Sequence, residues 1–345
     1  MEIKKYTLNK ERNVTLTCYL QAAGKEFRYV MRRPAVLILP GGGYQYCSVR
    51  EADPVAFPYL KAGYDAMILH YSVADHDKWP NPLDDYEQAM ALIRSKADEW
   101  KVYRDKIAVI GFSAGGHLAA CAASMSENRP NAAILGYAVT TGGTVKECNP
   151  SAPDVISHVD SRTCPCFLFA TRDDGIVPIQ NTIRMIDALE KAGISFESHI
   201  YAYGPHGFST GDSSIQPADS AMCPRVKNWV GDSIEWLRDI FGDFSQDGMT
   251  EPKCAARVNG DSDEFLSVDC TLGHLMKNQK AAEQLLPVLK SLAAAAGMDE
   301  KGLNMEDMTQ GVAGRMKLRD AFDLYNTPQA KISEVDEQLR NIPNA

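Results

Sequence analysis

The chain has 345 residues, enough for two domains or for one large domain with a small appendage. Its apolar fraction of 45% is ordinary for a globular enzyme, and no apolar run reaches membrane-spanning length. The formal net charge of −9 gives no basic footprint for nucleic acid and disfavours binding to anionic membranes.

The N-terminal segment and the cysteines bear on the compartment. Residues 1–16 spread their charges evenly and lack the apolar run of about 7 to 15 residues that a secretory signal needs. The nine cysteines are odd in number, and Cys164-Pro165-Cys166 matches neither a zinc knuckle nor a redox C-x-x-C motif. We therefore expect reduced thiols and a cytoplasmic location.

Strand and helix patterns alternate from the N-terminus to about residue 241. Glu2–Leu8 and Val14–Leu20 alternate polar and apolar residues, which predicts an antiparallel hairpin with one solvated face. The apolar run Ala35–Leu39, closed by a proline and three glycines, predicts a strand buried on both faces. A short helix over Pro54–Ala62 and a strand over Tyr64–Tyr71 follow.

The same alternation continues through the middle of the chain. Pro82–Trp100 has apolar residues at helical spacing and acidic side chains in its first turn, which suits the helix dipole. The strand Lys106–Ile110 leads into a glycine, and a helix follows from Ser113 to about Met125. The remaining predicted elements are strands over Ala132–Ala138, Phe167–Thr171 and Ser195–Tyr201 and helices over Ile179–Ala192 and Val226–Phe241.

Strands that alternate with helices predict an α/β fold with a mostly parallel, doubly wound sheet of about eight strands and helices on both faces. We expect this catalytic domain to span residues 1–241. Residues 242–263 are rich in Gly, Asp, Ser and Lys and are interpreted as a linker. Residues 264–345 then form a small all-helical module, with Lys280–Ala296 and Val335–Arg340 as its clearest helices.

The strongest chemical signal is Gly111-Phe112-Ser113-Ala114-Gly115. A G-x-S-x-G pattern alone is weak, but here an apolar strand enters it and a helix of small residues leaves it. That arrangement is typical of a nucleophile elbow, a tight turn that exposes a serine hydroxyl at the carboxyl edge of a sheet. The opposing interpretation is a glycine-rich turn with an unreactive serine.

A reactive serine needs a base, and the chain has seven histidines. His206 follows the last predicted strand and has Gly204 and Gly207 near it, so we predict that it is the base. His117 lies too close to Ser113 along the helix to reach its hydroxyl, and we expect it to pack or hydrogen-bond near the elbow.

The base in turn needs a carboxylate that fixes its tautomer. Asp173 and Asp174 both follow the strand Phe167–Thr171. We favour Asp174 as the partner of the histidine and expect Asp173 to shape the turn. The order Ser113, Asp174, His206 is that of α/β-hydrolases.

Acyl transfer also needs amides that stabilise an oxyanion. Pro40-Gly41-Gly42-Gly43-Tyr44 follows the strand Ala35–Leu39, and its glycines let backbone amides approach a substrate. We expect the amides of Gly41 or Gly42, together with that of Ala114, to contribute about 3–4 kcal/mol per donor.

Five segments together resemble the short-chain esterases of the α/β-hydrolase superfamily, nearest to the acetyl-xylan-esterase-like group. They are Pro40–Tyr44, Ser48–Glu51, Gly111–Leu118, Asp174–Pro178 and Gly204–Phe208. The resemblance covers about residues 30–240, and it implies deacetylation of acetylated sugars or plant oligosaccharides without a cofactor. One departure is Pro40, which stands where such esterases have the histidine of an H-G-G-G loop. The tail from Ser267 is similar to small helical extensions of some bacterial carbohydrate-active proteins.

The resemblance implies a small-molecule ester or acetylated saccharide as partner, and homo-oligomerisation is left open. Tyr44, Tyr46 and Trp79 could offer a stacking surface for a sugar, although each also fits ordinary loop packing. Thr141–Thr163 is the candidate for a short cap. No H-E-x-x-H motif or clustered ligand set points to a metal. Two alternatives are an acyl-peptide hydrolase with the same three residues and a binding protein whose site has decayed.

Overall fold

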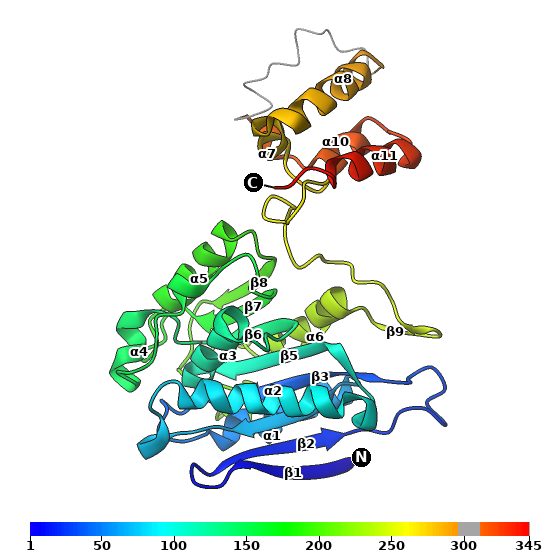
Figure 1. Cartoon of the computed structure of the whole chain (residues 1–345). Coiled ribbons are helices and arrows are strands. Elements are labelled where there is room, and N and C mark those ends of the chain that lie inside the picture. The colour runs from blue at the N-terminus through cyan, green and yellow to red at the C-terminus, as the bar shows by residue number, and fades with distance from the viewer. Residues whose placement is uncertain (296–310, 345) are drawn as a thin grey trace. The chain divides into compact units, whose positions relative to one another are not determined.

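The computed structural model describes residues 1–295 and 311–344 (Figure 1). The chain divides into two compact units, Met1–Ala256 and Arg257–Ala345. This boundary falls inside the segment 242–263 that the composition marked as a linker. Two short strands in that segment, β9 (Phe244–Ser245) and β10 (Gly248–Met249), form an antiparallel ladder. Strands of two residues leave no periodicity in a sequence, so they were not predicted.

One eight-stranded sheet organises the first unit, in the spatial order β1-β2-β4-β3-β5-β6-β7-β8. β2 pairs antiparallel with both β1 and β4, and the other neighbouring strands run parallel. The structure therefore confirms the predicted mostly parallel sheet. Its strands are β1 (Glu2–Asn9), β2 (Val14–Leu20), β3 (Arg33–Leu39), β4 (Asp65–His70), β5 (Val102–Phe112), β6 (Ala132–Gly136), β7 (Cys166–Thr171) and β8 (Phe196–Tyr201).

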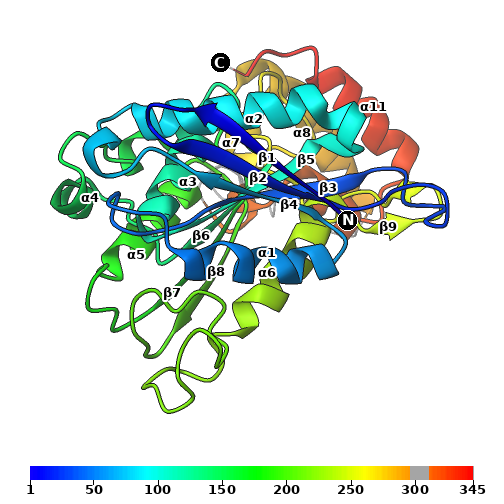
Figure 2. The ribbon, with the colours of Figure 1, turned by 90° about the horizontal axis from the view of Figure 1, so that it is seen from below.

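Helices cover both faces of this sheet, as the alternating pattern predicted. Residues of α2, α3 and α5 share one apolar cluster with the sheet, whereas α1 and α6 share a second cluster on the opposite face (Figure 2). The seven-residue α4 lies in the segment proposed as a short cap and is too brief to give a helical period. The helices of this unit are α1 (Asp53–Lys61), α2 (Asn81–Trp100), α3 (Ser113–Met125), α4 (Gly142–Cys148), α5 (Gln180–Lys191) and α6 (Asn228–Phe241).

The strand register determines which loops meet at the carboxyl edge. β3 and β5 are neighbouring parallel strands, and Leu39 lies opposite Gly111. The glycine-rich segment after β3 and the helix start after β5 therefore leave the sheet side by side. The loops after β7 and β8 leave at the same edge, because these strands are parallel to β6 and, through it, to β5. Ligands of open α/β sheets bind at this edge.

The second unit has its own apolar core, to which α8 contributes Leu285 and Leu289 and α11 contributes Val335. The last residue of the helix expected over Lys280–Ala296 lies outside the described residues. The short helices α7 and α10 were not predicted, because one or two turns do not establish a period. The described helices of this unit are α7 (Leu272–Lys277), α8 (Gln279–Ala295), α10 (Leu318–Leu324) and α11 (Gln329–Leu339).

Two further features concern the thiols and the lengths of the helices. All nine cysteines are free thiols. Among the residues that the structure describes, no helix combines the length and the apolar character needed to cross a bilayer.

A buried carboxyl group at the start of β4 makes stability depend on pH. Asp65 is fully buried, its Oδ1 accepts a hydrogen bond from the backbone amide of Gln21 at 2.7 Å, and its Oδ2 has no partner among the described residues. Burial raises the pKa of Asp65 from 3.8 to about 7, against the opposing influence of Gln21 and Arg33. The folded state thus holds this proton more tightly than the unfolded chain, so stability is lost as the pH rises from about 4 through 7.

We therefore expect the unfolding free energy of Asp65→Asn, measured relative to that of the wild type, to increase between pH 4.5 and pH 8. The increase should be at most about 4 kcal/mol. The amide keeps an acceptor for Gln21 and does not ionise. Urea unfolding of both proteins at the two pH values measures the difference. If the difference in unfolding free energy between the two proteins does not change with pH, the raised pKa of Asp65 is contradicted.

Candidate active site

Ser113 stands at a strained turn between β5 and α3. Its φ is +52°, in the left-handed region that a residue with a side chain adopts only where the surroundings impose it. Close packing leaves no space for side chains at the flanking glycines. A Cβ on Gly111 would lie 2.2 Å from the carbonyl oxygen of Gly115, and one on Gly115 would lie 2.2 Å from that of Leu39. The glycines of the motif thus let β3, β5 and α3 approach one another beneath the serine.

The structure brings Ser113, His206 and Asp174 together, although they lie far apart in the sequence. His206 Nε2 lies 2.9 Å from Ser113 Oγ, and His206 Nδ1 lies 2.7 Å from Asp174 Oδ2. An ionised carboxylate only accepts hydrogen bonds, so Nδ1 carries the hydrogen and Nε2 is left to accept from the serine hydroxyl. The imidazole thereby connects a hydroxyl to a carboxylate.

The two neighbouring aspartates, Asp173 and Asp174, make different hydrogen bonds. The Asp174 side chain is 1% exposed, and its Oδ1 accepts the amides of Ile176 at 2.8 Å and Val177 at 3.0 Å. Asp173 instead accepts the amide of Gly204 at 2.8 Å, at the start of the loop that carries His206. The geometry thus places Asp174 beside the imidazole and gives Asp173 a part in shaping the loops.

The glycine-rich segment requires a correction. The amide of Gly41 donates to the Glu51 carboxylate at 2.7 Å and is not available to a substrate, so the expectation that it could hold an oxyanion is wrong. The amide of Gly42 makes no hydrogen bond to any residue that the structure describes. Ala114 belongs to the first turn of α3, where amides have no partner within the helix. Gly42 and Ala114 therefore remain the candidate donors to an oxyanion.

The aromatic residues near this loop differ in their access to solvent. Tyr44 is fully buried and packs against Tyr71, so the expectation that it stacks on a sugar is wrong. Trp79 is half-buried against the ring of His117, with 5.6 Å between ring centroids. Tyr46 is 60% exposed, and its ring borders Gly42. Tyr46 therefore offers the most open aromatic surface beside the loop.

His117 has a structural environment and does not reach the serine hydroxyl. It is fully buried, with Nδ1 2.7 Å from the Tyr44 hydroxyl and Nε2 2.9 Å from the carbonyl oxygen of Pro153. Burial lowers the pKa of His117 to about 4, so its ring is neutral near pH 7. These contacts tie α3 to the loop after β3 and to the segment after α4.

Two residues behind the site were not predicted to take part in it, although Glu51 ends one of the segments that carry the resemblance. Glu51 is 3% exposed and Tyr137 is 1% exposed, and the tyrosine hydroxyl donates to Glu51 at 2.5 Å. The Tyr137 ring stands edge-on to His206, with 5.0 Å between centroids. A single acidic residue between two loops gives no sign in the sequence that it is buried. Only the pairing of distant strands reveals this contact.

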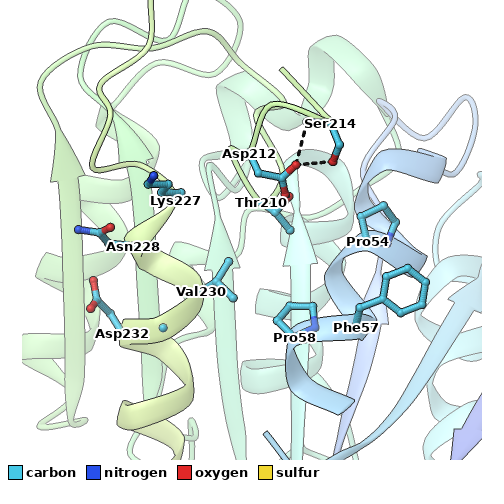
Figure 3. A pocket seen from close by; sticks show the side chains of 11 residues that line it. Pro54, Phe57, Pro58, Thr210, Asp212, Ser214, Lys227, Asn228, Val230 and Asp232 are labelled. Carbon is cyan, nitrogen blue, oxygen red and sulfur yellow. Dashed lines mark hydrogen bonds between the residues drawn. The ribbon is translucent and has the colours of Figure 1, made fainter. Parts of the chain in front are cut away.

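A cavity lies away from Ser113, Asp174 and His206. One cavity of about 770 Å³ lies between the first turns of α1 and α6 and the loop around Asp212, and Phe57 and Val230 line it (Figure 3). None of Ser113, Asp174 and His206 lines it. Within residues 1–295 and 311–344, no group of three or more His, Cys, Asp or Glu side chains is placed to share a metal ion.

Two family models match the first unit. The BD-FAE model matches residues 29–134, and the prolyl oligopeptidase family model matches residues 146–223. These ranges together contain the elbow, the glycine-rich segment and the loops that carry Asp174 and His206.

Solved structures match the chain over most of their own length. An α/β-hydrolase enzyme, MGS-M1, from a Medee basin deep-sea metagenome library is 41% identical with a TM-score of 0.65, over 70% of this chain and 98% of its own. An acetyl ester-xyloside bifunctional hydrolase from Caldicellulosiruptor lactoaceticus is 28% identical with a TM-score of 0.58, over 66% of this chain and 88% of its own.

Among curated proteins, an acetylxylan esterase of Xylanibacter ruminicola is 29% identical over 234 residues, which are 60% of this chain and 47% of the relative. The chain spans less than half the length of the first curated relatives it matches.

Proposed function

The chain belongs to the α/β-hydrolase superfamily, and on this basis we propose that it is a serine carboxylesterase that removes short acyl groups, above all acetyl groups from sugars or xylo-oligosaccharides. The observation that carries the proposal is the pair of contacts at His206, 2.9 Å to Ser113 Oγ and 2.7 Å to Asp174 Oδ2. This geometry is the one that activates a serine for attack on an acyl carbon.

The reaction proceeds through an acyl-enzyme. His206 Nε2 takes the proton of Ser113 as Oγ attacks the ester carbonyl, and the amides of Gly42 and Ala114 stabilise the oxyanion. The C–O bond to the alcohol then breaks, and the alcohol leaves with the proton from His206. Water next attacks the acyl group and gives its proton to His206, and the carboxylic acid departs as Ser113 regains its hydrogen. Asp174 stays ionised and balances the imidazolium charge.

A polar hollow beside the glycine-rich segment supports a sugar as the alcohol part of the substrate. Its volume is about 460 Å³, and Tyr46 and Gln45 line it next to the 3₁₀ turn Ala74–His76. Asp75 and His76 add hydrogen-bonding groups, while Tyr46 presents an aromatic face beside Gly42. An aromatic face with several polar groups suits a ring that carries hydroxyl groups on an apolar frame.

An ester panel tests the substrate class. We expect rates for p-nitrophenyl esters to fall from acetate to octanoate, and we expect acetate release from acetylated xylo-oligosaccharides. A preference for octanoate would contradict the acetylesterase assignment.

The match to the prolyl oligopeptidase family favours a peptidase as the second candidate. Cleavage of an aminoacyl p-nitroanilide faster than p-nitrophenyl acetate would support it instead.

Tyr46→Ala tests the sugar-binding role of the hollow. We expect the KM for an acetylated xylo-oligosaccharide to rise about tenfold, or roughly 1.4 kcal/mol, because a stacking face is lost. The KM for p-nitrophenyl acetate should stay within about twofold, since this small ester does not occupy the hollow. Tyr29→Ala is the matched control. Tyr29 is 52% exposed and precedes β3, so it lies at the amino ends of the parallel strands, away from the loops that carry the site. Equal effects on both substrates would refute a sugar-specific contact.

A further inference from the structure

A buried carboxylate lies behind the glycine-rich segment, and the mechanism above does not use it. Glu51 ends the 3₁₀ turn Val49–Glu51 and is 3% exposed. Burying a charge is costly unless hydrogen bonds compensate for the lost water. Both oxygens of Glu51 have such partners. Oε2 accepts the amide of Gly41 at 2.7 Å, and Oε1 accepts the hydroxyl of Tyr137 at 2.5 Å.

The first of these contacts fixes the position of the segment after β3. Gly41 is held at its amide by Glu51 and at its carbonyl oxygen by the amide of Ser48, at 2.9 Å. A Cβ on Gly41 would lie 2.7 Å from Glu51 Oε2 and 3.0 Å from the Ser113 Cβ, so carboxylate, glycine and serine are in close contact. The next amide along the chain is that of Gly42, the donor assigned to the oxyanion.

The second contact continues to the loop that carries His206. The Tyr137 hydroxyl donates to Glu51 and accepts the amide of Ser209 at 3.1 Å. The Ser209 hydroxyl donates back to the carbonyl oxygen of Arg50, the neighbour of Glu51, at 2.5 Å. Two hydrogen-bonded routes thus connect the 3₁₀ turn to the segment three residues after His206.

We propose that Glu51 is a positioning residue, whose carboxylate holds the oxyanion-binding segment through Gly41 and couples it through Tyr137 to the loop of His206. This inference rests on the proposed function. Both loops leave the sheet separately, and Glu51 is the group that contacts the first directly and the second through one hydroxyl. Burial raises the pKa of Glu51 above its ordinary value, and the hydrogen bonds from Tyr137 and Gly41 oppose part of that rise.

Glu51→Gln and Tyr137→Phe test the coupling. Glutamine keeps the size but has one acceptor oxygen for two donors, the Gly41 amide and the Tyr137 hydroxyl, so one of them must lose its acceptor. Phenylalanine removes only the tyrosine hydroxyl. We expect kcat for p-nitrophenyl acetate to fall about 100-fold in Glu51→Gln and about tenfold in Tyr137→Phe, with KM within about twofold. The inhibition constant of a trifluoromethyl ketone, which forms an oxyanion on Ser113, should rise by the same factors. The double variant should resemble Glu51→Gln, because the two residues act as one unit.

Two matched controls separate positioning from a general loss of structure. Asp65→Asn changes another buried carboxylate that accepts a backbone amide, at the opposite edge of the sheet. Tyr59→Phe removes another buried tyrosine hydroxyl, which lies 2.7 Å from the Ser233 hydroxyl. Both should keep kcat and the inhibition constant within about twofold, whatever their change in melting temperature.

The outcomes discriminate clearly. Folded Glu51→Gln with kcat within twofold of the wild type would overturn the inference, as would a fall in kcat without a matching rise in the inhibition constant. If Glu51→Gln does not fold, Tyr137→Phe decides by the same two measurements. Failure of the wild type to hydrolyse any ester would overturn the proposed function instead, a result that these comparisons among variants cannot mimic.

Discussion

Ser113→Ala is expected to lower kcat for p-nitrophenyl acetate by about a million-fold, as for serine hydrolases in which the nucleophile is removed. Alanine removes the oxygen that lies 2.9 Å from His206 Nε2, so no acyl-enzyme forms. The fold should persist, because the left-handed turn is already held by close packing against Gly111 and Gly115. Substrate hydrolysis and labelling by a fluorophosphonate, followed by mass spectrometry, measure the effect.

Two further variants complete this experiment. Ser124→Ala is the control, because Ser124 is a buried serine on the same helix whose hydroxyl donates to the carbonyl oxygen of Ala120. It should keep near wild-type rates and full labelling. His206→Ala should lose about as much activity as Ser113→Ala, and the double variant should lose no more, since the two groups act in one step. Residual activity of Ser113→Ala within tenfold of the wild type would refute the mechanism.

Much of the fold could be predicted from local sequence patterns. A strand buried on both faces, such as β3, gives a continuous apolar run. A long helix such as α2 repeats apolar residues at helical spacing over its 20 residues. Elements below about two turns, such as α7 and α10, give no period and were missed. Their helical form depends on packing within the second unit, which local propensity does not encode.

The site divides in the same way. Ser113 and His206 could be chosen from the sequence as candidates, because each follows a strand and lies among glycines that suit a tight turn. The hydrogen-bond partners of individual backbone amides and side chains could not be predicted. The sequence cannot distinguish the amide of Gly41 from that of Gly42, because the difference is the Glu51 carboxylate, which arrives from another loop. For Tyr44 the sequence left sugar stacking and loop packing open, and the contact that excludes stacking is with His117, whose Nδ1 lies 2.7 Å from the tyrosine hydroxyl in the core.

The sharpest comparison at this site lies between two adjacent aspartates. Asp174→Asn is expected to lower kcat by about 10⁴-fold, as when the carboxylate of such a triad becomes an amide. The orientation of the new amide is fixed, because its oxygen must stay with the amides of Ile176 and Val177, which now hold Asp174 Oδ1. Its NH₂ group then faces His206 Nδ1 and donates to it. The ring proton moves to Nε2, which can no longer accept from Ser113.

Asp173→Asn is the matched control for this argument, since its remaining oxygen can still accept the Gly204 amide that Asp173 accepts now. We expect it to keep kcat within about threefold of the wild type, because the acceptor survives and the imidazole is not touched. Nitrogen chemical shifts of the His206 ring provide the second readout: the Asp174 variant should carry its proton on Nε2 and the Asp173 variant on Nδ1. If Asp173→Asn loses activity and shifts the tautomer while Asp174→Asn does neither, the orienting carboxylate is Asp173. The contact between Asp174 and the imidazole would then not be the one that the reaction uses.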